Sequence, residues 1–101
     1  MLNSIQERIL QNKIKKGFPI GDVDYDLEKI QEEINEFIEA NAANDNENRA
    51  EELADIIILV IGISSYFKID IEKSVLDKLS KIEKRIITKL ANGKYTKEEA
   101  I

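Results

Sequence analysis

Two pairs of carboxylates, each with a spacing of three residues, are the part of the sequence best suited to do chemistry. Glu33 and Glu36 form the first pair, and Glu52 and Asp55 form the second. Residues three apart are neighbours on a helix, so each pair would share one helical face. Crowded carboxylates repel one another, and a divalent cation would remove that repulsion. The pairs therefore favour a metal site made of oxygen ligands, with Mg²⁺ as the expected ion and Mn²⁺ as a substitute.

The alternative for these residues is an ordinary solvated acidic surface. The chain carries 20 acidic and 15 basic residues, so acidic side chains must appear on several helix faces. Glu28, Glu39 and Glu51 are expected to be only surface charges, and Glu32 a supporting or solvated residue. A calcium loop over residues 22–33 is a further alternative. We disfavour it because Leu27 stands where such a loop turns on glycine.

Composition excludes several classes of site. The chain has no cysteine and no histidine, which excludes disulfide scaffolds, zinc fingers, thiol catalysis and histidine-based triads. The net charge is -5, and no dense basic cluster suggests nucleic-acid binding. The longest apolar stretch is far shorter than the ~20 residues that span a bilayer, and no signal sequence opens the chain. We therefore expect a cytoplasmic protein with neither membrane nor nucleic acid as a partner.

Turn signals divide the chain into four expected helices. Ser4 and Glu7 are spaced as a capping box for a first helix that runs to about Lys15. A segment with two glycines and a proline follows, at residues 16–21. Asp22 or Asp24 would then cap a second helix, which ends before a polar loop at residues 41–48.

The third and fourth helices are expected on either side of residue 70. Asn48 would cap the third helix, which continues through the apolar run 56–61. This run is rich in β-branched residues, but it follows an acidic helical segment directly, so we predict a central, buried helix. Asp70 would cap a fourth helix with an apolar stripe to Leu90, ended by Asn92 and Gly93 and followed by a short tail. The short loop between the second and third helices favours an antiparallel hairpin, which would bring the carboxylate pairs face to face.

The order of these motifs resembles the MazG-like all-α NTP pyrophosphatases, a group that includes dimeric dUTPases and dCTP pyrophosphatases. The similarity rests on two carboxylate motifs, Glu32-Glu33-x-x-Glu36 and Glu52-x-x-Asp55. The segment 12–18 is similar to the N-terminal segment of the group, and 78–85 to its basic stretch. The resemblance implies an all-α, antiparallel four-helix bundle that spans residues 1–101 as a single domain. The apolar surface of the third helix is more than four modest stripes would cover, so we also expect the bundle to be completed by oligomerisation, as a homodimer or homotetramer.

The resemblance further implies Mg²⁺-dependent hydrolysis of a nucleoside triphosphate to the monophosphate and pyrophosphate, in nucleotide pool sanitation. Four carboxylates would bind the metal, and one of them would orient or deprotonate the attacking water. Six other residues would bind substrate, with the basic ones neutralising phosphate and the aromatic one stacking on a base. The metal-binding and catalytic residues are Glu33, Glu36, Glu52 and Asp55, and the substrate-binding residues are Lys13, Lys16, Phe18, Lys78, Lys81 and Arg85.

Two positions depart from the pattern of this group. Leu59 stands where relatives often carry an aromatic residue, and Ile82 stands where they often carry asparagine. These differences leave the base and the sugar of the substrate open. The main alternative function is a catalytically degenerate helical module that dimerises and binds a protein partner. A calcium- or metal-buffering domain is a third possible function.

Overall fold

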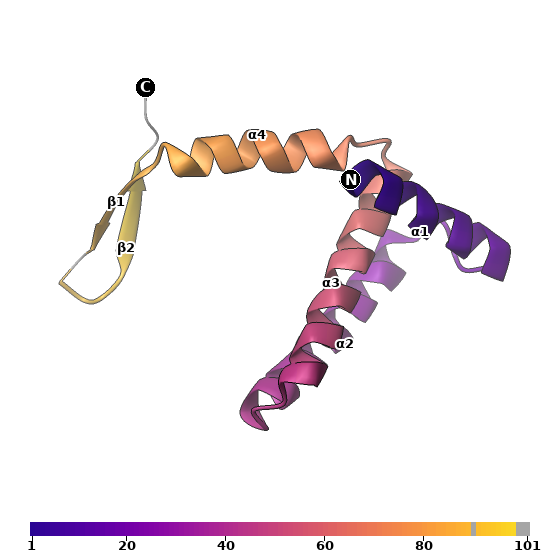
Figure 1. Ribbon diagram of the computed structural model, residues 1–101, viewed down its shortest axis with the longest axis horizontal. Coiled ribbons are helices and arrows are strands. Elements are labelled where there is room, and N and C mark those ends of the chain that lie inside the picture. Colours follow the sequence, from indigo (N-terminus) through magenta and orange to yellow (C-terminus); the bar gives the residue numbers. More distant parts are fainter. Residues whose placement is uncertain (90, 99–101) are drawn as a thin grey trace. The chain divides into compact units, whose positions relative to one another are not determined.

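Four helices and a two-stranded sheet make up the computed structural model, which describes residues 1–89 and 91–98 (Figure 1). The predicted all-α class and its four helices are confirmed. The small sheet at the C-terminal end was not predicted. In chain order, the elements are α1 (Leu2–Lys16), α2 (Val23–Ala42), α3 (Asn46–Tyr66), α4 (Ile71–Glu83), β1 (Ile86–Lys89) and β2 (Tyr95–Glu98).

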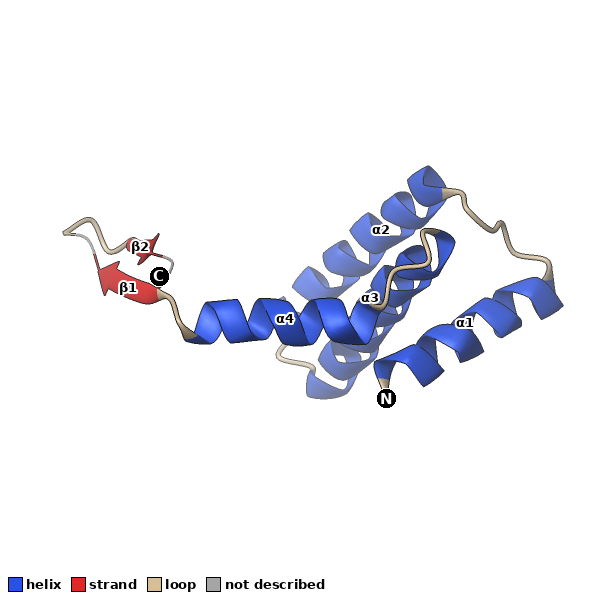
Figure 2. Cartoon of the chain, turned by 90° about the horizontal axis from the view of Figure 1, so that it is seen from above, coloured by secondary structure: helices blue, strands red, loops and turns tan. Residues whose placement is uncertain are grey.

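The chain forms two compact units, Met1–Ile71 and Glu72–Ile101. In the first unit, α3 packs against both α1 and α2. The helices α2 and α3 lie side by side and run in opposite directions (Figures 1 and 2). Only residues 43–45 connect them, which confirms the predicted antiparallel hairpin. Because α2 is an uninterrupted helix from Val23, a calcium loop at residues 22–33 is ruled out.

The helix ends show which capping predictions were right. Asp22 caps α2 by accepting a hydrogen bond from the backbone N–H of Tyr25, as predicted. The predicted cap of α1 is wrong, because Ser4 lies inside that helix and its hydroxyl donates to the carbonyl of Met1. Asn48 does not cap α3. Asp45 does so instead, and it accepts the N–H of Asn48, so that α3 begins earlier than predicted.

The central position of α3 is confirmed, but its predicted burial is wrong for a single chain. Ile61 is only 4% exposed, where the helix meets its neighbours. In contrast, Ile57, Ile58 and Val60 are 55%, 45% and 46% exposed. The reason is geometric: α3 is apolar on nearly every side, whereas α1 and α2 cover only part of its circumference.

The second unit differs from the prediction of one long fourth helix. The helix α4 ends at Glu83, and β1 and β2 then pair as an antiparallel hairpin with Lys89 opposite Tyr95. The β-branched run at residues 86–88 favours a strand once a partner strand is available. Gly93 has φ 84° and serves the hairpin turn rather than a helix end. Leu90, where the fourth helix was expected to end, and the last three tail residues lie outside the described residues.

Among the residues that the structure describes, no helix combines the length and the apolar character needed to cross a bilayer.

Candidate active site

The hairpin of α2 and α3 brings three of the four predicted carboxylates into one cluster. Glu33, Glu36 and Glu52 each offer a carboxylate oxygen, and these oxygens lie within 4.8 Å of one another. Glu33 and Glu52 are half-buried, whereas Glu36 is exposed. We call these three residues the carboxylate cluster.

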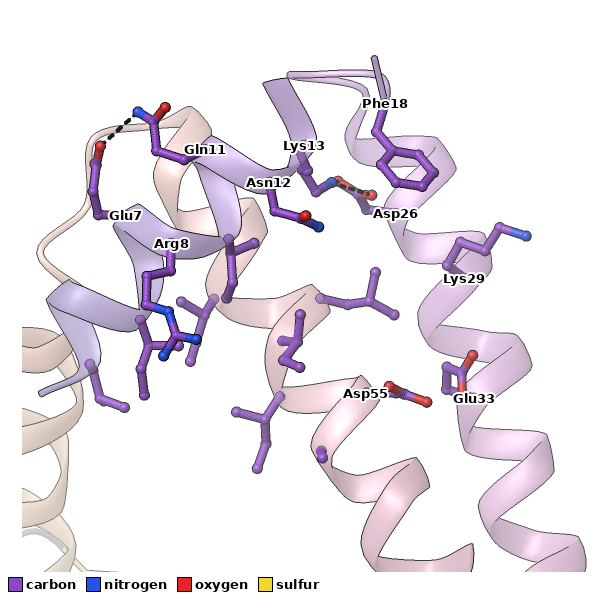
Figure 3. Close-up of a pocket in the computed structure, with 18 of the residues that line it drawn as sticks. Glu7, Arg8, Gln11, Asn12, Lys13, Phe18, Asp26, Lys29, Glu33 and Asp55 are labelled. Carbon is purple, nitrogen blue, oxygen red and sulfur yellow. Dashed lines mark hydrogen bonds and ion pairs between the residues drawn. The ribbon is translucent and has the colours of Figure 1, made fainter. Parts of the chain in front are cut away.

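Asp55 follows Glu52 by one helical turn on α3. Its carboxylate points toward Glu33 across the gap between the two helices (Figure 3). Its negative charge contributes to the raised pKa of Glu52, which shows that it lies close to the cluster. Asp55 is exposed, so its carboxylate stays in contact with solvent.

A hard divalent cation fits the carboxylate cluster. Glu33 Oε2 and Glu52 Oε2 are both buried and accept no hydrogen bond from the described residues. A buried polar atom without a hydrogen-bond partner lowers the stability of the folded state, and a charged carboxylate oxygen without a partner lowers it further. Mg²⁺ and Mn²⁺ prefer oxygen ligands of this type, and one such ion would partner both oxygens at once.

The proton affinity of the cluster reflects the same crowding. A protonated Glu33 can donate a hydrogen bond to Glu52, and this contact, with burial and the repulsion of Glu36, raises the pKa of Glu33 to about 8. The hydrogen bond with Glu33 lowers the pKa of Glu52. However, burial and the carboxylates of Glu36 and Asp55 more than offset that effect, so the pKa of Glu52 is also raised. Without a metal, the cluster therefore holds a proton that a cation would displace.

A cavity of about 1280 Å³ opens beside the cluster, between α1, α2 and α3. Its apolar lining comes mainly from α1 and α3, including Ile9, Ile58 and Leu59. Glu33 and Asp55 contribute carboxylates to the same cavity (Figure 3). We call this cavity the groove. It combines apolar surface for a flat ring with charged groups for phosphate and metal, which is the usual composition of a cofactor or substrate site.

Lys13, one of the predicted substrate-binding residues, is held in a buried network. Its Nζ lies 3.2 Å from Asp26 Oδ1 and 2.6 Å from Tyr66 Oη. The hydroxyl of Tyr66 donates to Asp26 Oδ2, and Asp26 is only 1% exposed. Burial lowers the pKa of Lys13, but hydrogen bonds to Tyr66 and Asp26 more than offset it, so the net pKa is raised and the ammonium stays charged.

The other predicted substrate-binding residues occupy different places. Phe18 lines the groove and is 48% exposed, and Lys16 lies in the last turn of α1. Lys78, Lys81 and Arg85 belong to the second unit, on α4 or just after it. The predictions did not include several polar residues that line the groove, because single charged or aromatic residues on an amphipathic helix carry no distinctive spacing. These are Arg8, Asn12, Tyr25, Asp26 and Lys29.

Two antiparallel helices that carry facing Glu-x-x-Glu and Glu-x-x-Asp motifs, with a third helix packed against one of them, are typical of the MazG-like all-α pyrophosphatases, and comparison with protein families places the chain within this class. The chain belongs to the phosphoribosyl-ATP pyrophosphohydrolase family, whose model matches residues 6–83. The match covers most of α1, all of α2 and α3, and α4 to its last residue. Enzymes of this family are pyrophosphohydrolases that act on phosphoanhydrides, which confirms the predicted enzyme class. No curated protein and no solved structure gives a significant match to the chain.

Proposed function

We propose that the chain is a Mg²⁺-dependent enzyme that cleaves the α–β anhydride of a nucleoside 5′-triphosphate group and releases pyrophosphate. The observation that supports this most is the pair of buried, unpartnered oxygens of Glu33 and Glu52 at the edge of a large groove. Such a pair is costly for a protein to keep unless a cation binds there. In this proposal, residues 1–101 act as one catalytic domain.

Each carboxylate has a role in the proposed reaction. Glu33, Glu36 and Glu52 would hold the metal, and Asp55 would add a further carboxylate ligand. The bound ion would supply Lewis-acid polarisation of the phosphoryl oxygens and neutralise charge on the triphosphate. One of the four carboxylates orients or deprotonates the water that attacks phosphorus. The apolar lining of the groove, which includes Phe18, binds the base of the nucleotide.

The substrate class follows from the reacting group. The name of the family points to phosphoribosyl-ATP, which carries the same 5′-triphosphate as ordinary nucleoside triphosphates. The carboxylate cluster acts only on that shared group, so the rest of the molecule is selected by the groove. We therefore propose two substrates for direct comparison, phosphoribosyl-ATP and a canonical or modified NTP or dNTP, the latter in nucleotide pool sanitation.

A substrate panel tests this proposal. The full chain would be incubated with Mg²⁺ and phosphoribosyl-ATP, the canonical NTPs and dNTPs, and modified triphosphates, and pyrophosphate release would be scored. We expect pyrophosphate and the matching monophosphate from at least one substrate. Asp55→Asn, which keeps the size of the side chain, should slow that turnover by orders of magnitude. If no substrate is cleaved with either Mg²⁺ or Mn²⁺, a helical binding module becomes the better account.

A further inference from the structure

A triphosphate beside the carboxylate cluster needs more positive charge than one divalent cation supplies. It carries about four negative charges at neutral pH, and the cluster adds its own. Proteins that bind phosphate in this situation use Arg or Lys side chains near the metal. The cationic side chains that line the groove are Arg8, Lys13 and Lys29.

Two of these three cations already have partners. Lys13 donates to Asp26 and Tyr66 in the buried network, and its side chain is only 14% exposed. Lys29 forms an ion pair with Glu32 at 3.3 Å and lies 5.5 Å from the centre of the Tyr25 ring. A phosphate would have to break these contacts to recruit either residue.

Arg8 differs, because it forms no hydrogen bond or ion pair with any residue that the structure describes. Asn12 lies one turn further along α1, lines the same groove and likewise has no side-chain partner among the described residues. Figure 3 shows both side chains leaving α1 on the side of the groove. An arginine fork and an amide at a spacing of four residues present several N–H donors along one face of the helix.

The helix that carries Arg8 is fixed on both sides of it. Before Arg8, the Gln6 amide donates to Ser64 Oγ at 2.7 Å and to the carbonyl of Ile69 at 3.0 Å. After it, Lys13 reaches Asp26 and Tyr66. At Gly62 of α3 the two helices pack closely, since a Cβ there would lie 3.4 Å from Ile9 Cγ2 and 3.7 Å from Lys13 Cε, at ordinary van der Waals contact. Arg8 thus projects from a rigid element, as effective anion-binding groups do.

We infer that Arg8, assisted by Asn12, is the polyphosphate-binding group on the α1 wall of the groove, opposite the carboxylates of Glu33 and Asp55. This inference rests on the proposed function, since it completes the charge balance of the same site. It replaces Lys13 as the α1 cation that contacts phosphate. Lys13 is instead a positioning residue that fixes α1 against α2 and α3.

The test uses inorganic tripolyphosphate as a probe, with binding to the full chain measured by calorimetry in Mg²⁺ and again in EDTA. Arg8→Gln should weaken tripolyphosphate binding by about tenfold or more, as expected for the loss of a charge-assisted contact. Lys15→Gln removes an equal charge from α1 but not from the groove, so it should change the affinity by less than twofold. Mg²⁺ binding measured alone should be the same in both variants.

The outcomes separate this inference from the proposed function. The inference is overturned if Arg8→Gln binds tripolyphosphate as tightly as the wild type does, if both variants lose affinity equally, or if the wild type does not bind the probe. If Mg²⁺ fails to bind the wild type while tripolyphosphate binding still depends on Arg8, the inference stands and the proposed metal-dependent function fails.

Discussion

Glu33 links the charge of the site to the stability of the chain. Its carboxyl has an ordinary pKa of 4.5, which the neighbouring Glu52, burial and Glu36 raise to about 8 in the folded state. Between these two values the folded protein therefore binds more protons than the unfolded chain. Stability without metal must fall as pH rises through this window, because the slope of the unfolding free energy with pH follows the difference in bound protons.

Substituting Glu33 tests this directly. In metal-free solution, the free energy of unfolding of the wild type should decrease from about pH 5 to pH 8. Glu33→Gln cannot ionise, so it should flatten this decrease and raise stability at pH 8. Urea unfolding at several pH values measures both effects. Glu28→Gln, an exposed change on the same helix, should keep the wild-type slope; the assignment is wrong if both variants behave alike.

Metal binding should release a proton for the same reason. At pH 7 the free cluster holds a proton on Glu33, and Mg²⁺ needs the deprotonated carboxylate. Titration of Mg²⁺ in buffers of different ionisation enthalpy should therefore show proton release at pH 7, and affinity that rises toward pH 8 and above. Affinity that is constant between pH 6 and pH 9 would contradict the account.

The network of Lys13, Asp26 and Tyr66 should contribute to stability rather than to turnover. Tyr66→Phe removes the hydroxyl that donates to Asp26 and accepts from Lys13. We expect a loss of about 1–3 kcal/mol in unfolding free energy, as is typical when buried charged groups lose a partner. Tyr25→Phe is the matched control, because the Tyr25 hydroxyl has no partner among the described residues, and its effect should be within about 0.5 kcal/mol.

Some of the individual site residues could be predicted from the sequence, and others could not. The spacing of Glu33, Glu36, Glu52 and Asp55 was visible because helical periodicity converts spacing into proximity. The contacts of Asp26 and the role proposed for Arg8 were not visible in the sequence. Asp26 looked like one of several acidic residues at a helix start, and only the packing of three helices shows that its partner is Lys13.

At the scale of elements, local signals predicted helices well and their ends less well. Asp22, one of the two caps predicted for α2, is the residue that caps it. Before α3, however, Asp45 and Asn48 could both cap, and sequence alone does not rank them. The end of α4 was missed because residues 86–88 continue its apolar pattern, while their strand conformation depends on pairing with residues eight to twelve positions further along.

Asp45 offers a test at this scale. Its side chain accepts a hydrogen bond from the N–H of Asn48 at 3.2 Å and another from the amide of Asn48 at 2.8 Å. Asp45→Ala should lower the unfolding free energy by about 1 kcal/mol. Asp45→Asn should lower it much less, because asparagine caps a helix about as well as aspartate. Chemical unfolding measures the difference, and equal losses in both variants would mean that the cap is not what Asp45 contributes.

The single chain exposes a large amount of apolar surface to solvent. Of the large apolar residues and alanines that the structure describes, only Ala40 and Ile61 are buried, at 6% and 4% exposure. Leu53 and Val60, seven residues apart on α3, are 47% and 46% exposed. So small a core is unusual for a stable domain of this length, which supports the prediction of a homodimer or homotetramer.

Light scattering can test that prediction. The wild type should have the mass of a dimer or tetramer at micromolar concentration, and its melting temperature should rise with protein concentration. Val60→Glu places a charge on the exposed face of α3 and should reduce the mass toward that of a monomer. Lys68→Glu, an exposed change just after α3, should not. A monomeric wild type would contradict the prediction.

The carboxylate cluster is proposed to bind the metal that drives pyrophosphate release. The most direct test of this proposal is the rate of pyrophosphate release at saturating Mg²⁺, on the best substrate of the panel, for the wild type, Glu52→Gln and Glu28→Gln. Glu52 contributes one of the two buried, unpartnered oxygens, whereas Glu28 is exposed and lies outside the cluster. We expect the rate to fall by at least about a hundredfold for Glu52→Gln and to stay at the wild-type value for Glu28→Gln. Equal rates in all three proteins would contradict the proposal.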